Sequence, residues 1–397
     1  MRSLVAILTG GGDRPYALGL ATTLKAREIP FDFIGSDDLQ SPDLCNAPSI
    51  RFLNLRVDQS PEAPFLAKVY RLAAYYLRLI VYAATAEPTL FHILWNNKFE
   101  HFDRTFLQLY YRALGKYVVL TVHNVNIRKR DGNDGRLNRF TLKCQYTLAH
   151  HLFVHTQQMK RELQSEFGVS DAKISVIPFG VNSTTPETSL TPGDARKRLG
   201  LSDSDKVVLF FGNIAPYKGL EFLVDAIAKL GDTAPDYRLV IVGRPKGSES
   251  YWSGIKERIA DLGIQSKVIE RIEYVPDGDT ELYFKAADVL VLPYTHVFQS
   301  GVLFLGYNFG LPVIAADVGS LKEDIVEGMT GYVFEPRNAD SLAAALERYF
   351  RSELYHLHEG GRARIRRFAF ERYSWVEVGN ITAAVYKRGL GENCQAL

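Results

Sequence analysis

The sequence predicts an α/β fold with two domains, each built on a parallel sheet. Three observations support this prediction. Short apolar runs of the kind that form buried strands alternate with segments of helical periodicity along the chain. Several of these runs end in a glycine-rich turn that leads into a helix, which is how parallel sheets build anion sites. The length of 397 residues allows two domains with separate hydrophobic cores.

Seven strand-like runs organise the first half of the chain. The alternation of these strands with helices favours a parallel sheet in this half of the chain. The first strand runs into Gly10, Gly11 and Gly12, where the backbone can approach a ligand closely. The spacing of these glycines differs from the dinucleotide-binding fingerprint. We expect strands at residues 4–8, 31–34, 51–55, 90–95, 118–122, 152–155 and 174–177, and helices that include residues 16–26, 105–114 and 157–167.

The second half repeats the order of strand, glycine turn and helix. An apolar strand at 207–211 leads into a turn that contains Lys218 and then into a helix over 219–230 with one apolar face. A later strand at 288–293 leads to the segment Gln299-Ser300-Gly301-Val302 and an apolar helix. Further strands are expected at 239–242 and 313–316, a linker rich in Ser, Thr and Pro at 182–195, and closing helices at 341–350 and 375–387.

Composition argues against several classes of protein. A net charge of +2 does not suit a chain that binds nucleic acid through phosphate contacts. The three cysteines, Cys45, Cys144 and Cys394, are far apart in the sequence, form no metal-type cluster and indicate a reducing compartment. We find neither a cleavable secretory signal nor a segment long and apolar enough to span a bilayer.

Residues 67–84 stand out as a helical segment rich in Tyr and Leu. Three basic residues, Lys68, Arg71 and Arg78, lie among the apolar ones. Two interpretations remain open. The segment is either a long helix packed on the first domain, or a peripheral membrane or lipid-acceptor surface.

Motifs in the second half resemble those of the nucleotide-sugar glycosyltransferases with two facing Rossmann-like domains (GT-B), and among these family 4. The resemblance covers nearly the whole chain and is more specific in its C-terminal half. It implies an acceptor-side domain at 1–185, a donor-binding domain at 186–375 and a last helix, about 376–397, that crosses back to the first domain. It also implies sugar transfer with retention of configuration. The carrying motifs are Tyr217-Lys218-Gly219-Leu220, Ala286-Ala287-Asp288-Val289, Gly310-Leu311-Pro312-Val313-Ile314, Asp317-Val318-Gly319, Gly328-Met329-Thr330-Gly331-Tyr332-Val333 and Pro336.

A nucleotide sugar leaves its diphosphate behind, so transfer needs positive potential at the leaving group. Lys218, at the start of the helix over 219–230, is the leading candidate, and a surface lysine is the alternative. The family commonly has an arginine in the same turn where this chain has Asn213, and Arg244 after the next strand can replace that charge. A second anion site is expected at the helix start Ser300-Gly301-Val302, where the alternative is a simple serine N-cap.

The chain departs from the family at two positions. Val297 and Leu305 stand where the family has two glutamates that contact the donor sugar and the ribose. Neither side chain can accept a hydrogen bond, so backbone groups of residues 298–301, or the polar Gln299, must take over, or the donor differs. The nucleotide base is expected to lie over the end of a strand. Nothing in the sequence distinguishes uridine from guanosine as the nucleoside. That strand end comprises Glu273, Tyr274 and Val275.

In the first domain, His123 follows the strand at 118–122, and the carboxyl end of a parallel strand points to the ligand side of the sheet. In the family a histidine at this strand end approaches the transferred sugar, and a structural histidine is the alternative. His150, His151 and His155 have a spacing that suits no convincing metal site. We assign Gly11 and Gly12 to the donor-binding set and Asn124, Trp95 and Asn96 to the acceptor side.

These observations predict a retaining glycosyltransferase that needs no metal or other cofactor. It would transfer a sugar from a UDP- or GDP-sugar to a glycan or lipid-linked acceptor in cell-envelope or exopolysaccharide synthesis. We expect it in the cytoplasm or on the inner face of the membrane, with no nucleic-acid partner. Two alternatives remain: a catalytically weak or inactive nucleotide-sugar binding protein of the same fold, and an enzyme of this fold that epimerises or phosphorolyses its sugar.

Overall fold

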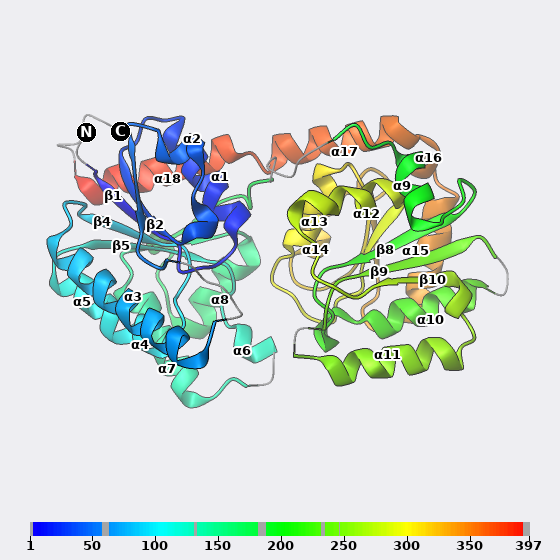
Figure 1. Ribbon diagram of the computed structural model, residues 1–397, viewed down its shortest axis with the longest axis horizontal. Helices are drawn as coiled ribbons and strands as arrows, with labels where there is room; N and C mark the ends of the chain where they lie inside the picture. The colour runs from blue at the N-terminus through cyan, green and yellow to red at the C-terminus, as the bar shows by residue number, and fades with distance from the viewer. Residues whose placement is uncertain are drawn as a thin grey trace. The chain divides into compact units, whose positions relative to one another are not determined.

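The computed structural model describes residues 3–57, 63–130, 133–181, 188–231, 235–245 and 247–391. The chain forms two compact units (Figure 1). The first comprises Met1–Gly180 with Tyr373–Leu397, and the second comprises Val181–Arg372. The expected domain boundaries, after residues 185 and 375, lie a few residues further along the chain. Residues 182–187 of the expected linker, and Cys394, lie outside the described residues.

The first unit is built on a parallel sheet of seven strands in the order β3-β2-β1-β4-β5-β6-β7. Each of the seven expected strands forms. β1, β4 and β6 are buried along their whole length, as expected for a parallel sheet whose two faces are both covered by helices. The strands are β1 (Val5–Leu8), β2 (Phe31–Gly35), β3 (Ile50–Asn54), β4 (Leu90–Ile93), β5 (Tyr117–Val122), β6 (His151–Val154) and β7 (Ile174–Val176).

Helices connect these strands, and the last helix of the chain belongs to the same unit. A segment of π-helix, η2 (Asp103–Leu107), interrupts the connection between β4 and β5. The other helices are α1 (Arg14–Lys25), η1 (Asp37–Leu39), α2 (Pro42–Cys45), α3 (Phe65–Thr85), α4 (Glu100–Phe102), α5 (Gln108–Ala113), α6 (Ile127–Arg130), α7 (Arg136–Leu148), α8 (Gln157–Phe167), η3 (Asp171–Lys173) and α18 (Trp375–Leu390).

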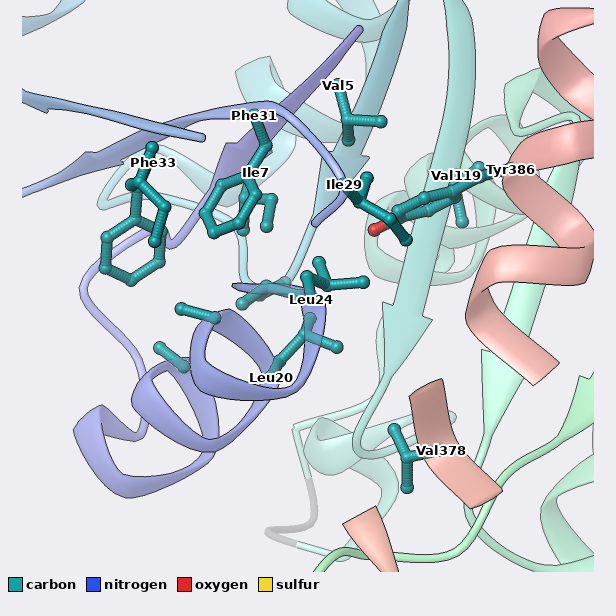
Figure 2. Close-up of a cluster of buried hydrophobic side chains, with 14 of the residues drawn as sticks. Val5, Ile7, Leu20, Leu24, Ile29, Phe31, Phe33, Val119, Val378 and Tyr386 are labelled. Carbon is teal, nitrogen blue, oxygen red and sulfur yellow. The ribbon is translucent and has the colours of Figure 1, made fainter. Parts of the chain in front are cut away.

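The core of the first unit lies between its central strands and the helices α1 and α18 (Figure 2). Alternate residues of β1 and β2 face these helices because side chains two apart along a strand lie on the same face. Burying each large apolar side chain stabilises the unit by about 1.5–3 kcal/mol. The labelled members are Val5, Ile7, Leu20, Leu24, Ile29, Phe31, Phe33, Val119, Val378 and Tyr386, all almost fully buried.

Trp375 anchors the start of α18 to this unit. The helix is capped by Ser374, whose hydroxyl accepts a hydrogen bond from Val376 N–H at 3.1 Å. The indole lies so close to Gly19 and to Gly180 that a Cβ at either glycine would overlap it. At the other end of the helix, the Tyr386 hydroxyl lies 2.6 Å from Nδ1 of His92 in β4. The last helix therefore packs on the first unit, as the family resemblance implies.

The second unit has a parallel sheet of six strands in the order β10-β9-β8-β11-β12-β13. Its strands are β8 (Lys206–Phe211), β9 (Tyr237–Val242), β10 (Val268–Arg271), β11 (Val289–Leu292), β12 (Val313–Ala316) and β13 (Gly331–Phe334). Its helices are α9 (Pro192–Leu199), η4 (Pro216–Lys218), α10 (Leu220–Gly231), α11 (Glu249–Asp261), η5 (Gln265–Lys267), η6 (Asp277–Asp279), α12 (Thr280–Ala286), α13 (Gly301–Asn308), α14 (Leu321–Asp324), α15 (Ala339–Phe350), α16 (Glu353–His356) and α17 (His358–Arg372).

Each sheet has one point at which the strand order reverses. In the first unit the chain leaves β1 for β2 on one side and later returns to β4 on the other. In the second unit the same happens at β8, between β9 and β11. Ligands of open parallel sheets bind beyond the carboxyl ends of the strands at such points. The fold therefore points to one candidate site in each unit.

Candidate functional site

In the second unit, the turn after β8 is held tightly against the end of β11. Gly219 adopts a left-handed conformation, with φ of 62°, and a Cβ there would overlap the carbonyl oxygen of Pro293. Thr295 N–H donates a hydrogen bond to the carbonyl of Tyr217 at 2.8 Å. Glycine is required at this position because any side chain would clash with the neighbouring strand end. The two segments thus form one rigid edge.

Lys218 lies within this edge and is only 6% exposed. A Cβ at Gly212, after β8, would lie 2.9 Å from the Lys218 Nζ and 3.5 Å from Cγ2 of Val302. The ammonium is also 5.2 Å from the centre of the Tyr294 ring. Lys218 lies just before α10, which begins at Leu220, as the sequence indicated, and its ammonium also lies near Val302 in the first turn of α13. A positive charge in such a desolvated position attracts an anion strongly.

The start of α13 has no side-chain cap. The Ser300 hydroxyl makes no hydrogen bond to the helix backbone and lies 3.4 Å from the Tyr294 hydroxyl. The simple N-cap interpretation is therefore wrong. A Cβ at Gly301 would meet nothing within 4 Å, so the space over the helix start is open. Because the first N–H groups of a helix have no partner within it, this helix start is suited to an anion.

Gln299, just before α13, has a side-chain oxygen that can accept a hydrogen bond from a ligand. The carbonyl of Phe298 already accepts hydrogen bonds from Ser320, from its N–H at 3.2 Å and its hydroxyl at 2.8 Å. The Oε1 atom of Gln299 is buried and has no hydrogen-bond partner among the described residues. A buried acceptor without a partner needs an explanation, and a bound ligand supplies one.

Val297 and Leu305, which stand in place of the two family glutamates, offer no acceptor here. Val297 is buried, and its carbonyl is packed so closely against Gly319 that a Cβ there would overlap it. Leu305 is half-buried on α13. Gln299, two residues after position 297, is a polar side chain that can take the place of the lost carboxylate.

The other donor-binding residues expected in the second unit lie on loops at the same edge of the sheet, whereas Gly11 and Gly12 lie in the first unit. The Arg244 guanidinium, after β9, lies 5.4 Å from the centre of the Tyr274 ring, after β10. Asn213 is exposed after β8, and Glu273 and Val275 flank Tyr274. Four neighbouring strand ends, from β10 to β11, span roughly 14 Å. That span suits an elongated ligand such as a nucleotide sugar.

In the first unit, side chains from neighbouring strand ends stack on one another. The His123 ring, after β5, lies parallel to the Trp95 indole, after β4, with ring centres 4.0 Å apart. A Cβ at Gly12, after β1, would overlap the same indole. Gly11 plays a similar part because a Cβ there would overlap the Arg56 guanidinium. The glycine turn therefore makes room for Trp95 and Arg56, which together cover it.

The hydrogen bonds of His123 fix which of its ring nitrogens carries a proton. His155 Nδ1 lies 3.4 Å from the carbonyl oxygen of Ile177, which can only accept, so this Nδ1 carries the proton. Burial lowers the pKa of His155 to about 4, so its Nε2 is bare and accepts from His123 Nδ1–H at 3.1 Å. Burial also lowers the pKa of His123 well below its usual value. Neutral His123 therefore keeps a bare Nε2, which is buried and has no partner among the described residues.

Four of the expected residues line one cavity of about 170 Å³ in the first unit. These are Trp95, Asn96, His123 and Asn124. The remaining walls include Glu100, Arg104, Gln145 and Tyr146 from α4, η2 and α7. Arg104 binds Glu100 at 2.8 Å, and the Gln145 side-chain amide donates to Asn96 at 2.9 Å. The cavity is thus rich in hydrogen-bonding groups, as a polyhydroxyl ligand requires.

Several of these residues carry no signal in the sequence. Arg104 and Gln145 lie inside helices, where only the three-dimensional packing reveals that they reach a cavity. Arg56 and Tyr294 follow strands β3 and β11, so their position beyond a strand end was the available clue. In the described part of the chain no group of three or more His, Cys, Asp or Glu side chains is arranged to hold a metal ion. None of the described helices combines the length and hydropathy that crossing a bilayer requires.

Comparison with known families decides which class this architecture represents. The model of Glycosyltransferase Family 4 matches residues 10–185, and that of Glycosyl transferases group 1 matches residues 193–367. The chain belongs to glycosyltransferase family 4. Both candidate sites of this family 4 chain lie within the matched ranges.

Curated relatives share moderate sequence identity with this family 4 chain. D-inositol 3-phosphate glycosyltransferase of Acidothermus cellulolyticus is 34% identical over 257 residues, which cover 62% of this chain and 54% of the relative. The protein of the same name from Mycobacterium bovis is 30% identical over 287 residues, which cover 70% and 56%. The chain thus spans about half the length of these relatives.

Solved structures confirm that the fold of this family 4 chain is GT-B. Sucrose-phosphate synthase from Thermosynechococcus elongatus has a TM-score of 0.75 at 20% identity and covers 98% of this chain and 99% of its own. The Anabaena protein HepE, in complex with UDP-glucose, has a TM-score of 0.73 at 17% identity and covers 97% and 99%. At these identities the likeness concerns the fold alone.

Proposed function

We propose that the protein is a retaining glycosyltransferase that moves a sugar from a nucleoside-diphosphate sugar to a glycan or lipid-linked acceptor. The observation that carries this proposal is the edge of the second sheet, where buried Lys218 borders the uncapped start of α13. A lysine ammonium and a helix N-terminus act on the same small volume there, and a diphosphate is the ligand class that matches both.

The proposed reaction uses the leaving diphosphate as its own proton acceptor. The bond between the anomeric carbon and the diphosphate oxygen breaks, and Lys218 and the N–H groups of α13 stabilise the charge that develops. The acceptor hydroxyl forms the new bond on the same face of the sugar and gives its proton to the departing phosphate oxygen. No side-chain base is required, which agrees with the neutral, weakly basic state of His123.

His123 has a different role in this proposal. Its bare Nε2 can accept a hydrogen bond from a sugar hydroxyl but has little tendency to take the proton, because burial lowers its pKa. Gln299 Oε1 offers a second acceptor for hydroxyls of the donor, in place of the family glutamate at position 297. Arg244 and Tyr274 are the proposed contacts of the nucleoside end.

A ligand screen followed by a transfer assay tests the proposal. Thermal unfolding is measured with UDP, GDP, ADP and their sugars, because a ligand at 100 times its Kd stabilises the native state by about 2.7 kcal/mol. We expect UDP or GDP, and the matching sugar, to raise the melting temperature. The matching donor is then incubated with candidate acceptors, and the product is detected by mass spectrometry. Failure of every nucleoside diphosphate to shift the transition at millimolar concentration would refute the proposal.

A second candidate function is a nucleotide-sugar binding protein with little or no transferase activity. The replacement of both family glutamates by Val297 and Leu305 favours it. The two functions differ in one readout. Binding of the nucleotide sugar without a transferred product, across lipid-linked and glycan acceptors, favours the binding protein.

The proposed setting is synthesis of cell-envelope or exopolysaccharide glycans, on the cytoplasmic side of the membrane. Activity is expected without an added metal or cofactor, because Lys218 and the start of α13 would supply the positive potential that a metal provides in other sugar transferases.

A further inference from the structure

A face of the first unit gathers exposed apolar side chains. It consists of α3, α4, η2, α5 and α7, and we name it the basic apolar face; Figure 1 labels α3, α4, α5 and α7 within the first unit. Most of the exposed large apolar residues in the described chain lie on these helices or next to them. Phe65 is 78% exposed, Phe106 70% and Phe140 63%. Apolar side chains that gather in this way mark an interaction surface, whereas scattered ones do not.

The apolar side chains of this face are continuous from one helix to the next. Tyr76 of α3 stacks on Phe99, with ring centres 5.4 Å apart, and contacts Phe102 at 5.6 Å. Phe102 in turn stacks on Phe106 at 6.1 Å. Phe106 borders an apolar groove of about 870 Å³, whose opposite wall is formed by α7 with Phe140. Although Tyr76 itself is buried, one chain of ring contacts thus links α3 to the exposed Phe99, Phe102 and Phe106 at the groove.

The charge of this face is strongly biased. α3 carries Lys68, Arg71 and Arg78 and no acidic residue, and α7 carries Arg136, Arg139 and Lys143 and no acidic residue. Of the two acidic residues in α4 and η2, Glu100 is paired with Arg104 and Asp103 is buried. Basic residues that flank protruding aromatic and aliphatic side chains match the chemistry of an anionic lipid surface, in which phosphates lie above hydrocarbon. A second copy of this chain is a poor occupant, because two basic faces repel each other.

We propose that the basic apolar face docks the protein on an anionic lipid bilayer. The side chains of Phe106, Phe140 and the first turn of α3 would enter the interface, and the basic residues would contact lipid phosphates. The same helices line the 170 Å³ cavity with their other faces: Arg104 of η2 and Gln145 of α7 line that cavity, and Phe106 and Phe140 line the groove. Docking would therefore hold the acceptor-side cavity beside the bilayer, a consequence that rests on the proposed function.

Vesicle co-sedimentation of the full chain tests the docking itself, independently of transfer activity. Vesicles of phosphatidylcholine alone are compared with vesicles that contain 30% phosphatidylglycerol, at about 0.1 M and 0.5 M salt, where screening differs strongly. We expect binding to the anionic vesicles that weakens at high salt. The double variant Arg136→Gln/Lys143→Gln should bind at least tenfold more weakly, since each basic residue near the surface contributes roughly fivefold.

The apolar contribution is tested with Phe106→Ser/Phe140→Ser, which we also expect to bind at least tenfold more weakly. Both side chains are exposed, so the fold should be kept, and a thermal unfolding scan checks this. The matched control Phe370→Ser/Val376→Ser removes exposed apolar side chains elsewhere and should bind like wild type. The proposal is overturned if wild type binds neither vesicle, or if the control and test variants bind alike. A concentration-dependent dimer that only Phe106→Ser/Phe140→Ser dissolves would also overturn it, in favour of a second copy as the occupant.

Discussion

Two buried side chains carry most of the chemistry proposed for this chain. The proposed role of each depends on the residues that surround it. Lys218 lies beside Gly212 and near Val302 at the start of α13, whereas the sequence motif indicated only its own turn. His123 is held neutral between Trp95 and His155, and its proton is directed to Nδ1 by a chain that ends at a backbone carbonyl. The sequence pointed to both residues, but the groups that define their roles come from other strands.

Removal of the Lys218 charge should weaken nucleoside diphosphate binding by roughly tenfold or more. One charge-assisted contact to phosphate is worth on the order of 1.5–3 kcal/mol. Lys218→Met is preferred to Lys218→Ala, because it keeps the volume that packs near Phe210 and Tyr294. Isothermal titration calorimetry with the diphosphate identified by the ligand screen gives the Kd.

Lys229→Met is the matched control for this measurement. Lys229 lies on α10, is paired with Asp340 and is half-exposed, so its loss should leave the Kd unchanged. Equal affinities of wild type and a folded Lys218→Met variant would remove Lys218 from the phosphate site.

Substitution of His123 should reduce turnover far more than nucleotide binding. A side chain that acts at the reacting centre typically contributes about 10²-fold or more. His123→Phe keeps a ring that can stack on Trp95 but lacks Nε2, whereas His123→Ala removes both. We expect kcat to fall by about 10²-fold in both variants and the Kd of the free nucleoside diphosphate to stay within about twofold.

The comparison of these two variants separates chemistry from packing. If His123→Phe restores wild-type turnover, His123 acts only by filling space beside Trp95. If the Kd rises together with the loss of turnover in a folded variant, the assignment of the diphosphate to the second unit is wrong.

Glycines at helix starts serve two opposite purposes in the second unit. At Gly219 the chain needs a left-handed conformation and close approach to Pro293, so glycine is a requirement of the fold. At Gly301 nothing surrounds the missing Cβ, so the fold does not need glycine there. An open helix start without a serine cap is consistent with a position kept clear for a ligand.

The substitutions Gly301→Ala and Gly219→Ala should therefore have opposite effects. Gly301→Ala should leave stability unchanged or raise it by up to about 1 kcal/mol, and should weaken nucleotide-sugar binding because its methyl group occupies the ligand space. Gly219→Ala should lower stability clearly, since it strains the backbone and clashes with Pro293. Chemical denaturation and calorimetry give the two quantities. Wild-type donor affinity in Gly301→Ala would show that this helix start does not bind the ligand.

Across the molecule, prediction from sequence succeeded where the signal is local. Apolar runs such as residues 118–122 formed their strands, and the glycine turns ended at the edges expected to bind ligand. It failed where a role depends on partners distant in sequence. Gln145 reaches Asn96 across 49 residues, and the Ser300 hydroxyl contacts Tyr294, a partner that the sequence did not indicate. Such contacts depend on side-chain direction in the folded chain, which periodicity does not encode.

Sugar transfer should persist after treatment with EDTA. In the proposed site the positive potential at the diphosphate comes from Lys218 and the N–H groups of α13, so a metal ion is not needed there. The initial rate is measured with millimolar EDTA and then with excess Mg²⁺ or Mn²⁺. A complete loss of rate that either ion restores would contradict this account of the phosphate site.

Acidification should destabilise the first unit more than the second. Burial lowers the pKa of His92 to about 3 and that of His155 to about 4, and it lowers the pKa of His123 as well. All three lie in the first unit. In the unfolded chain a histidine titrates near pH 6.5, so between that pH and the native pKa values the unfolded state binds more protons. The stability from keeping these rings neutral is present in full above about pH 6.5 and is lost as the pH falls toward 4, by up to about 1.4 kcal/mol per pH unit for each fully buried ring.

Asp103 acts in the opposite direction, because burial raises the pKa of its carboxyl group to about 6 and protonation relieves the cost of burying the charge. Burial raises the pKa of Glu162 as well and lowers those of His150 and His151 to about 4, so the buried histidines outnumber these carboxyl groups and acidification leaves a net loss of stability. Urea unfolding followed by tryptophan fluorescence in Trp252→Phe measures it, since Trp95 and Trp375 then report on the first unit alone. We expect the urea midpoint to fall clearly between pH 7 and pH 5. A midpoint at pH 5 that equals or exceeds the value at pH 7 would mean that these histidines are protonated in the native state, and the bare Nε2 assigned to His123 would then be wrong.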